Sequence, residues 1–387
     1  MSTVALVNIG TVLTGDSQEP RADADVLVMR EGKIGYLGDR TGWDLSDVEQ
    51  VWDVQGMTVT PGLIDSHTHP AIGDWSPRQG TLGWLNSTLH AGVTSTLSMG
   101  EARIEEAPGD PAGVKALAIL AAKTFRKHRP GGMKVHAGAV WPVSGLAEPD
   151  IAEMAANGVW ALAEIGAYEL PPVDEVLRIV DAARRHGLKV PLHTGGRRRP
   201  GTAGIGFELA RQVRPDVACH LSGGPTPAPW ADIERVIVET DCYLELCSAG
   251  NPRVTRDIAA LAAERGELHR IMLGSDTPSS LGMIPIAIPR LMSFLASLLG
   301  LPAEQVVAMA TGNTARAYGL SCGLIQPGRD ADVLVLDVPV SSWGTTPAES
   351  IERGENLAVS AIFVDGALAT SAPRNTQPAS RRIKRVR

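Results

Sequence analysis

The chain has 387 residues, 44% of them apolar and 20% charged, so it is long enough for one large or two ordinary globular domains. Its 36 basic and 43 acidic side chains give a net charge of −7, which provides no basic footprint for nucleic acid or an anionic membrane. The N-terminus lacks a leader pattern and no apolar run reaches about 18 residues, so we expect a cytoplasmic protein without a membrane span.

The two ends of the chain share a β-rich pattern. Residues 1–58 hold short apolar runs separated by turn signals such as EGK and DVQGM, and residues 323–374 return to this pattern. Because each part alone is too small for a good core, we expect the two to form one β-sandwich. Residues 375–387, which end in RRIKRVR, are predicted to be a solvated basic tail.

Residues 59–322 alternate short apolar runs with helical stretches such as PVDEVLRIVDAARRHG, which indicates βα units and a parallel sheet. Eight βα units favour a closed barrel over a doubly wound open sheet, for which no GxGxxG motif opens a helix. The predicted fold is therefore α/β, a (β/α)8 TIM-like barrel with a small β-sandwich built from both chain ends. The eight predicted strands are residues 62–69, 93–100, 133–140, 159–166, 189–196, 217–224, 242–250 and 271–278.

Metal-binding residue types gather where these strands end. His67 and His69 are two positions apart, so they point to one face of the first strand. Since the chemistry of such barrels lies at the carboxyl ends of the strands, we expect the side chains there to converge. Four imidazoles and two carboxylates can hold two divalent cations, which can share a hydroxide in a hydrolytic reaction. The remaining four lie toward the ends of the fourth, fifth, sixth and eighth predicted strands: Glu164, His193, His220 and Asp276.

A pair of cations needs an anionic bridge. We favour Glu164, which follows the apolar run VWALA, over a carboxylated Lys134, because Lys134 lies early in its strand. Asp276, in MLGSDTP, is expected to bind a cation and to transfer the proton of the attacking water, with a helix N-cap as its structural alternative. His136 shares the strand face of Lys134 and is expected either to contact substrate or to pack.

The four cysteines fall in or near apolar runs and form no CxxC pair, so we predict reduced core residues. One of them, Cys219, directly precedes His220 in a strand-like run. Neighbouring strand residues point to opposite faces, so Cys219 should face away from whatever His220 faces.

The order of these residues, with β segments on both sides, resembles the amidohydrolase superfamily over nearly the whole chain. The resemblance implies that the first-strand histidines and the eighth-strand aspartate bind one cation, and the fifth- and sixth-strand histidines the other. In that family the fourth strand commonly supplies a carboxylated lysine as the bridge. This chain departs from the pattern there, and Glu164 takes the position.

Several loops resemble more narrowly the family members that hydrolyse a cyclic enamide, among them LHTGG (192–196), HLSGGPT (220–226) and MATGNTA (309–315). This resemblance implies a zinc and iron centre, a homotetramer or homodimer, and a small substrate that carries a carboxylate. The implied substrate is 6-oxo-1,4,5,6-tetrahydronicotinate, opened to 2-formylglutarate and ammonia.

Three residues near the predicted strand ends are expected to bind this substrate. An arginine at the mouth of the site could pair bidentately with the substrate carboxylate. A run of three arginines, residues 197–199, is also typical of a solvated surface. The candidates for substrate binding are Arg78, Gln79 and Arg197.

Two other classes of function remain open. The same scaffold could hydrolyse an imidazolone, a hydantoin or a dipeptide, or act as a deaminase. A deaminase usually has one metal and a glutamate after the fifth strand, and LHTGGRRRP contains none. A non-catalytic scaffold protein of this fold typically loses metal ligands, whereas all six positions are filled here.

Overall fold

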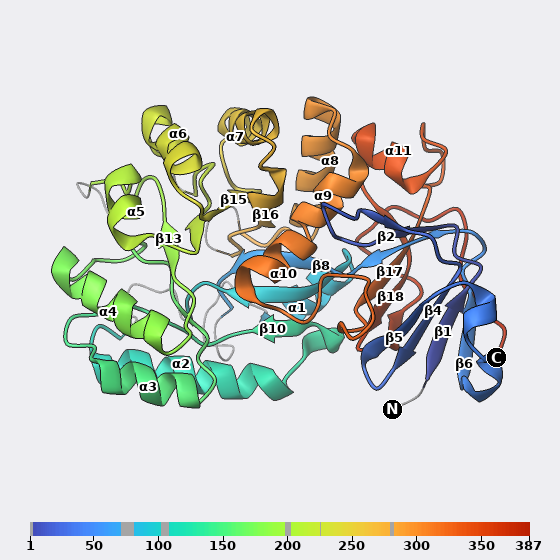
Figure 1. Cartoon of the computed structure of the whole chain (residues 1–387), viewed down its shortest axis with the longest axis horizontal. Coiled ribbons are helices and arrows are strands. Elements are labelled where there is room, and N and C mark those ends of the chain that lie inside the picture. The colour runs from blue at the N-terminus through green and yellow to red at the C-terminus, as the bar shows by residue number, and fades with distance from the viewer. Residues whose placement is uncertain (1–2, 71–80, 102–107, 198–202, 225, 279–281) are drawn as a thin grey trace.

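The computed structural model describes residues 3–70, 81–101, 108–197, 203–224, 226–278 and 282–387. Two parts lie side by side: an α/β part formed by the middle of the chain, and a β part in which the blue N-terminal and red C-terminal strands interleave (Figure 1). Among the described residues, no helix is both long and apolar enough to cross a lipid bilayer.

The β part consists of two sheets with one shared core. Strand β17 pairs with β18 on one side and with β7 on the other, so the last part of the chain is hydrogen-bonded to the first. Fully buried side chains from both sheets pack together, including Leu6, Leu27, Val59 and Phe363. The first sheet has the order β20 (Lys384–Arg385), β6 (Gln50–Asp53), β1 (Val4–Val7), β4 (Val26–Arg30) and β5 (Lys33–Gly38); the second has the order β19 (Ala367–Thr370), β18 (Ala358–Val364), β17 (Val333–Asp337), β7 (Thr58–Pro61), β2 (Thr11–Leu13) and β3 (Arg21–Ala22).

The basic C-terminal end corrects one expectation. Six of its last seven residues are exposed, as expected of a solvated end, but the end is not free: it forms the short strand β20, which pairs antiparallel with β6 and covers the edge of the first sheet. Upstream, the guanidinium of Arg381 donates to Asp337 Oδ1 at 2.6 Å, and the Asp337 side chain is fully buried. An open strand edge and a buried carboxylate therefore supply partners that the local sequence does not reveal.

All eight runs predicted as strands in the middle of the chain are strands in the structure. They pair in parallel within three sheets, ordered β10-β9-β8, β11-β12 and β13-β14-β15-β16. Gly138, at a φ of 101°, separates the two halves of the third run. The strands are β8 (Leu63–Thr68), β9 (Val93–Ser98), β10 (Lys134–His136) with β11 (Ala139–Val140), β12 (Ala161–Leu162), β13 (Pro191–His193), β14 (Val217–Cys219), β15 (Tyr243–Cys247) and β16 (Ile271–Gly274).

Isolated bridges link these three sheets. Two parallel bridges, Ala161 to Lys189 and Ile165 to Leu192, connect the segment that contains β12 with the segment that contains β13. A third bridge, Thr68 to Thr277, connects β8 with the segment after β16. Because neighbouring strands are parallel, their carboxyl ends lie at the same side of the assembly, where the candidate site forms.

Helices follow the strands in alternation. Their ends carry recognisable signals: α2 begins with Pro111 behind the Asp110 cap, and α7 begins with Pro252 behind the Asn251 cap. In α4, apolar side chains three and four positions apart turn one face into the core. The helices are α1 (Thr81–Leu89), α2 (Pro111–Lys127), α3 (Glu148–Ala156), α4 (Val173–Arg185), α5 (Phe207–Val213), α6 (Trp230–Glu239), α7 (Pro252–Glu264), α8 (Ala287–Leu299), α9 (Ala303–Met309), α10 (Gly312–Tyr318) and α11 (Pro347–Glu352).

Candidate metal centre

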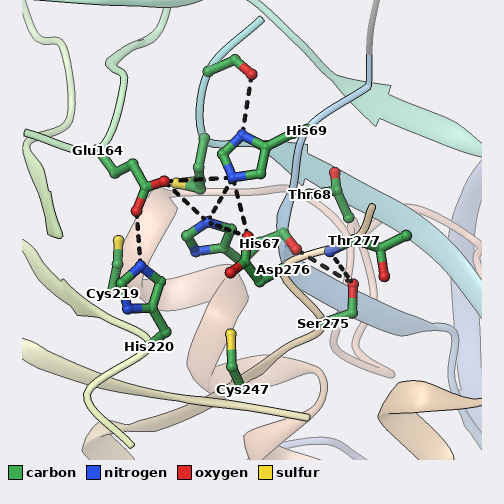
Figure 2. Close-up of polar contacts among 12 residues, drawn as sticks. His67, Thr68, His69, Glu164, Cys219, His220, Cys247, Ser275, Asp276 and Thr277 are labelled. Atoms are coloured by element: carbon green, nitrogen blue, oxygen red, sulfur yellow. Dashed lines mark hydrogen bonds and ion pairs between the residues drawn. The ribbon is translucent and has the colours of Figure 1, made fainter. Parts of the chain in front are cut away.

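Six side chains meet where the strands of the α/β part end, and Figure 2 shows five of them around one point. None of the six is more than 2% exposed to solvent. They come from β8, β13 and the residues just after β8, β12, β14 and β16, as the sequence predicts. The six are His67, His69, Glu164, His193, His220 and Asp276.

The first half of the cluster contains the two histidines of the HxH motif. His67 Nε2 and His69 Nε2 are 3.1 Å apart. Asp276 Oδ1 lies 3.3 Å from His69 Nε2 and 3.7 Å from His67 Nε2. Glu164 Oε1 approaches the same two nitrogens at 3.4 and 3.8 Å, so two carboxylates face this pair of imidazoles.

The second half of the cluster uses the other oxygen of the same glutamate. Glu164 Oε2 lies 3.2 Å from His193 Nδ1 and 2.9 Å from His220 Nε2. In each half, a glutamate oxygen and two imidazole nitrogens all lie within 4.8 Å of one another. One carboxylate is therefore shared by two groups of three donors.

Hydrogen bonds to the outer ring nitrogens select which nitrogens face the centre. His69 Nδ1 lies 3.2 Å from the Gly100 carbonyl oxygen, and His193 Nε2 lies 3.0 Å from the Gly196 carbonyl oxygen. A carbonyl only accepts, so each of these nitrogens carries the proton. The opposite nitrogen of each ring then presents a lone pair toward Glu164, as a metal ligand must.

The electrostatics of the cluster also favour a cation. Burial alone lowers the pKa of His67, but the carboxylates of Glu245 and Glu164 outweigh it and raise that pKa well above its usual value. Burial and the nearby His220 lower the pKa of His193, which keeps that imidazole neutral and able to ligate. A buried set of imidazoles and carboxylates fits zinc, iron, manganese or nickel.

Backbone geometry aims two of the side chains. Asp276 has a φ of 55° and His220 a φ of 33°, which are uncommon for residues other than glycine. The Asp276 amide donates to the His67 carbonyl at 2.9 Å, and the His69 amide donates to Thr277 at 2.8 Å. The tight exits from β14 and β16 thus turn His220 and Asp276 into the cluster, and strained backbone of this kind is typical of functional sites.

The same geometry explains why the expectation for Cys219 is wrong. Cys219 does not point away from the site, because its Sγ lies within 4.8 Å of ligand atoms of His67 and Glu245. The positive φ at His220 breaks the alternation of strand faces, so neighbouring residues both turn inward. The prediction that all four cysteines are buried and unpaired is confirmed.

Lys134 lies elsewhere. Its ammonium is bound by three carboxylates, at 2.6 Å from Asp365, 2.9 Å from Asp332 and 3.0 Å from Asp330, where the α/β part meets the β part. His136 belongs to the same neighbourhood, since burial and then the charge of Lys134 lower the pKa of His136 to about 4. No described contact joins either residue to the histidine cluster.

Sequence reasoning missed several buried acidic residues near the site, among them Glu245 and Glu101. Glu245, in the middle of β15, places Oε1 2.9 Å from His67 Nδ1. Glu101 follows β9, and its Oε1 accepts a hydrogen bond from the Gly138 amide at 2.9 Å. A glutamate between two leucines, as in YLELC, is the signal that could have identified Glu245, because a charge inside an apolar strand requires a partner.

A pocket of about 340 Å³ opens beside Glu164. Two of its walls are Trp141 and Tyr168, whose rings meet edge to face at a centroid separation of 4.6 Å. Gly100 makes room for this wall, because a Cβ at its φ of 146° would lie 2.1 Å from the Trp141 ring. The pocket has the size and the mixed aromatic and polar lining of a small-molecule site.

Of the predicted substrate contacts, only Arg197 and His136 are among the described residues. Arg197 directly follows Gly196, whose carbonyl oxygen faces His193 Nε2. Its Nε atom is buried and has no hydrogen-bond partner within the described ranges. Arg78 and Gln79 lie outside the described residues.

Comparisons with known proteins agree on one family. The sequence profile of the amidohydrolase family matches residues 58–369. The enamidase of Eubacterium barkeri is 38% identical over 384 residues, which cover 99% of this chain and 100% of the relative. A crystal structure of enamidase superposes with a TM-score of 0.95 at 38% identity and covers 100% of both chains. An imidazolonepropionase of Deinococcus deserti is 27% identical over 82% of this chain and 86% of its own.

Proposed function

The chain belongs to the amidohydrolase family, and we propose that it is an enamidase-like enzyme that opens the C–N bond of a cyclic amide with the help of two divalent cations. The observation that carries this proposal is the carboxylate of Glu164, which faces two histidines with each of its oxygens. Sharing one anion between two groups of ligands is what a binuclear hydrolytic centre requires.

The residues of the two halves would hold one cation each. His67, His69 and Asp276 would bind the first, His193 and His220 the second, and Glu164 would bridge them. When bound, such a pair supplies a nucleophile at neutral pH and polarises the carbonyl that is attacked. Imidazole and carboxylate donors suit several divalent metals, and zinc and iron are the ones that we propose because the resemblance to cyclic-enamide hydrolases implies them.

Asp276 has the position required of the proton carrier. Its carboxylate lies 3.3 Å from His69 Nε2, and only 1% of the residue is exposed. As a carboxylate it would accept a proton from the attacking water, and as an acid it would return that proton to the departing ring nitrogen. Because little water reaches it, the proton would pass to the substrate rather than to solvent.

The substrate that we propose is a carboxylated cyclic enamide, 6-oxo-1,4,5,6-tetrahydronicotinate, in nicotinate degradation. The first water cleaves the amide, and a second water replaces the nitrogen of the resulting enamine, which gives 2-formylglutarate and ammonia. The pocket beside Glu164, which Trp141 and Tyr168 help to line, would hold the ring, and Arg197 would bind the carboxylate.

We also infer that the eight parallel strands close into a (β/α)8 barrel. The bridges from β12 to β13 and from β8 to the segment after β16 support this closure, as does the likeness to enamidase. On the basis of this likeness we further propose that the protein is a cytoplasmic homo-oligomer, either a tetramer or a dimer. Size-exclusion chromatography with light scattering would test the oligomeric state.

The experiment that tests the function combines metal analysis with a panel of small rings. We expect two metal equivalents per chain and ammonia release from the carboxylated enamide, which a chelator abolishes and added metal restores. Neutral lactams, hydantoins and an imidazolone complete the panel, since an imidazolonepropionase is among the relatives. Full turnover after complete removal of metal would refute the proposal. Turnover of the imidazolone alone would show that an imidazolone, and not the carboxylated enamide, is the substrate.

A further inference from the structure

The outer ring nitrogens of three of the four histidines have partners that differ between the two halves of the centre, and His220 Nδ1 has no partner among the described residues. His69 and His193 each face a neutral backbone carbonyl, those of Gly100 and Gly196. His67 alone faces a carboxylate, because its Nδ1 lies 2.9 Å from Oε1 and 3.3 Å from Oε2 of Glu245. The described contacts thus place an additional negative charge behind only one half of the centre.

Glu245 is enclosed in the core directly behind His67. It lies between Leu244 and Leu246 in β15, and its exposure is 0%. The thiol of Cys247 donates to Glu245 Oε1 at 3.2 Å, which gives that oxygen a second contact besides His67 Nδ1. Gly274 on the neighbouring strand leaves the necessary room, because a Cβ there would lie 2.6 Å from Glu245 Oε1 and 2.8 Å from the Cβ of His67.

We propose that Glu245 is a positioning residue for the metal centre. Its carboxylate holds His67 with the proton on Nδ1. As a result, the half that contains His67 and His69 binds its cation more tightly than the half that contains His193 and His220. A carboxylate behind a ligating imidazole fixes the ring and raises the basicity of the nitrogen that binds metal. A backbone carbonyl is neutral and has a weaker effect. The inference rests on the proposed function, since it assumes that cations occupy both halves.

The test is a metal titration of the wild-type protein and of the isosteric variant Glu245→Gln, each stripped with a chelator. Zinc binding is followed by competition with a chromophoric chelator, and cobalt binding by its visible absorption. In the wild type we expect two equivalents of unequal affinity. In Glu245→Gln we expect the tighter equivalent to weaken by about 10- to 100-fold, and the other to keep its affinity.

Two further variants assign the effect. Glu101→Gln is the matched control, because it also places an amide where a buried carboxyl stood, but its hydrogen bond goes to the Gly138 amide rather than to a histidine. We expect it to bind both equivalents as the wild type does. His220→Ala removes a ligand of the other half, so it should weaken the equivalent that Glu245→Gln leaves unchanged.

Several outcomes would overturn the inference. It would be overturned if Glu245→Gln left both metal affinities unchanged. It would also be overturned if Glu245→Gln and His220→Ala weakened the same equivalent, or if the wild type bound a third equivalent that disappeared with Glu245. If Glu245→Gln does not fold, Glu245→Asp takes its place, since the shorter side chain retreats from Nδ1 and should weaken the same equivalent. A wild-type chain that binds no divalent cation would overturn the proposed function as well, whereas the other outcomes leave that function intact.

Discussion

Replacing Lys134 by methionine should destabilise the protein without disturbing the metal centre. The side chain of Lys134 is only 8% exposed, and its ammonium binds the carboxylates of Asp330, Asp332 and Asp365 at 3.0 Å or less. Methionine keeps much of the length and apolar volume of the side chain but removes its charge. The size of the effect depends on how many of the three carboxylates are left without a neighbouring positive charge.

The neighbours show that only one carboxylate is left without a cation. Asp330 keeps Lys33 at 2.5 Å, and Asp365 keeps an ion pair with Arg129. Among the described residues, the side chain of Asp332, with an exposure of 0%, keeps only a hydrogen bond from the Asp365 amide at 3.0 Å. Removing one partner of a buried ion pair costs about 3–5 kcal/mol, so we expect a loss of this size rather than three times as much.

The loss should depend on pH with a defined sign. Burial raises the pKa of Asp332 above its usual value of 3.8, even though Lys134 opposes the shift. Without Lys134 this pKa should rise further, so the folded state binds a proton more readily than the unfolded state does. The cost of the buried charge is then present above the raised pKa and disappears as the pH falls through it.

Urea denaturation of metal-loaded protein, followed by circular dichroism, measures this effect. Lys33→Met is the matched control, because Lys33 binds the same Asp330 but its side chain is 49% exposed, so its loss should cost at most about 1 kcal/mol. Lys134→Met should retain both metal equivalents and its turnover. Wild-type stability in this variant would refute the reasoning, and loss of metal or activity at unchanged stability would indicate a carboxylated Lys134 as the bridge.

Three further predictions concern the site. Asp276→Asn should lower kcat by about 10²- to 10⁴-fold, because an amide cannot carry the proton; ammonia release measures this, and near wild-type turnover would remove the acid–base role of Asp276. Glu164→Gln should reduce the metal content below two equivalents, since a neutral amide replaces the shared anion; elemental analysis measures it, and two retained equivalents would contradict the bridge. Arg197→Ala should raise KM about tenfold for a carboxylated lactam and leave KM for a neutral lactam unchanged, because a charged hydrogen bond is lost; equal effects on both substrates would exclude the pairing.

Much of the site could be predicted because the relevant signals are local. The spacing of His67 and His69 places both on one strand face, and their Nε2 atoms indeed lie 3.1 Å apart. The apolar runs before Glu164, His193 and His220 place these residues at the ends of parallel strands, whose carboxyl ends lie at one side. Strand periodicity and residue type are properties of short segments, so they can be read without the fold.

The sequence by itself determined the alternation of strands and helices, and the identity of the polar residues where the strands end. Only the tertiary structure decided that Lys134 pairs with aspartates of the β part, that Glu245 stands behind His67, and that the basic end joins a sheet. Each of these outcomes depends on a partner far away in the chain. The inward turn of Cys219 depends on the sign of φ at His220, which the packing of the loop after β14 fixes and residue type does not.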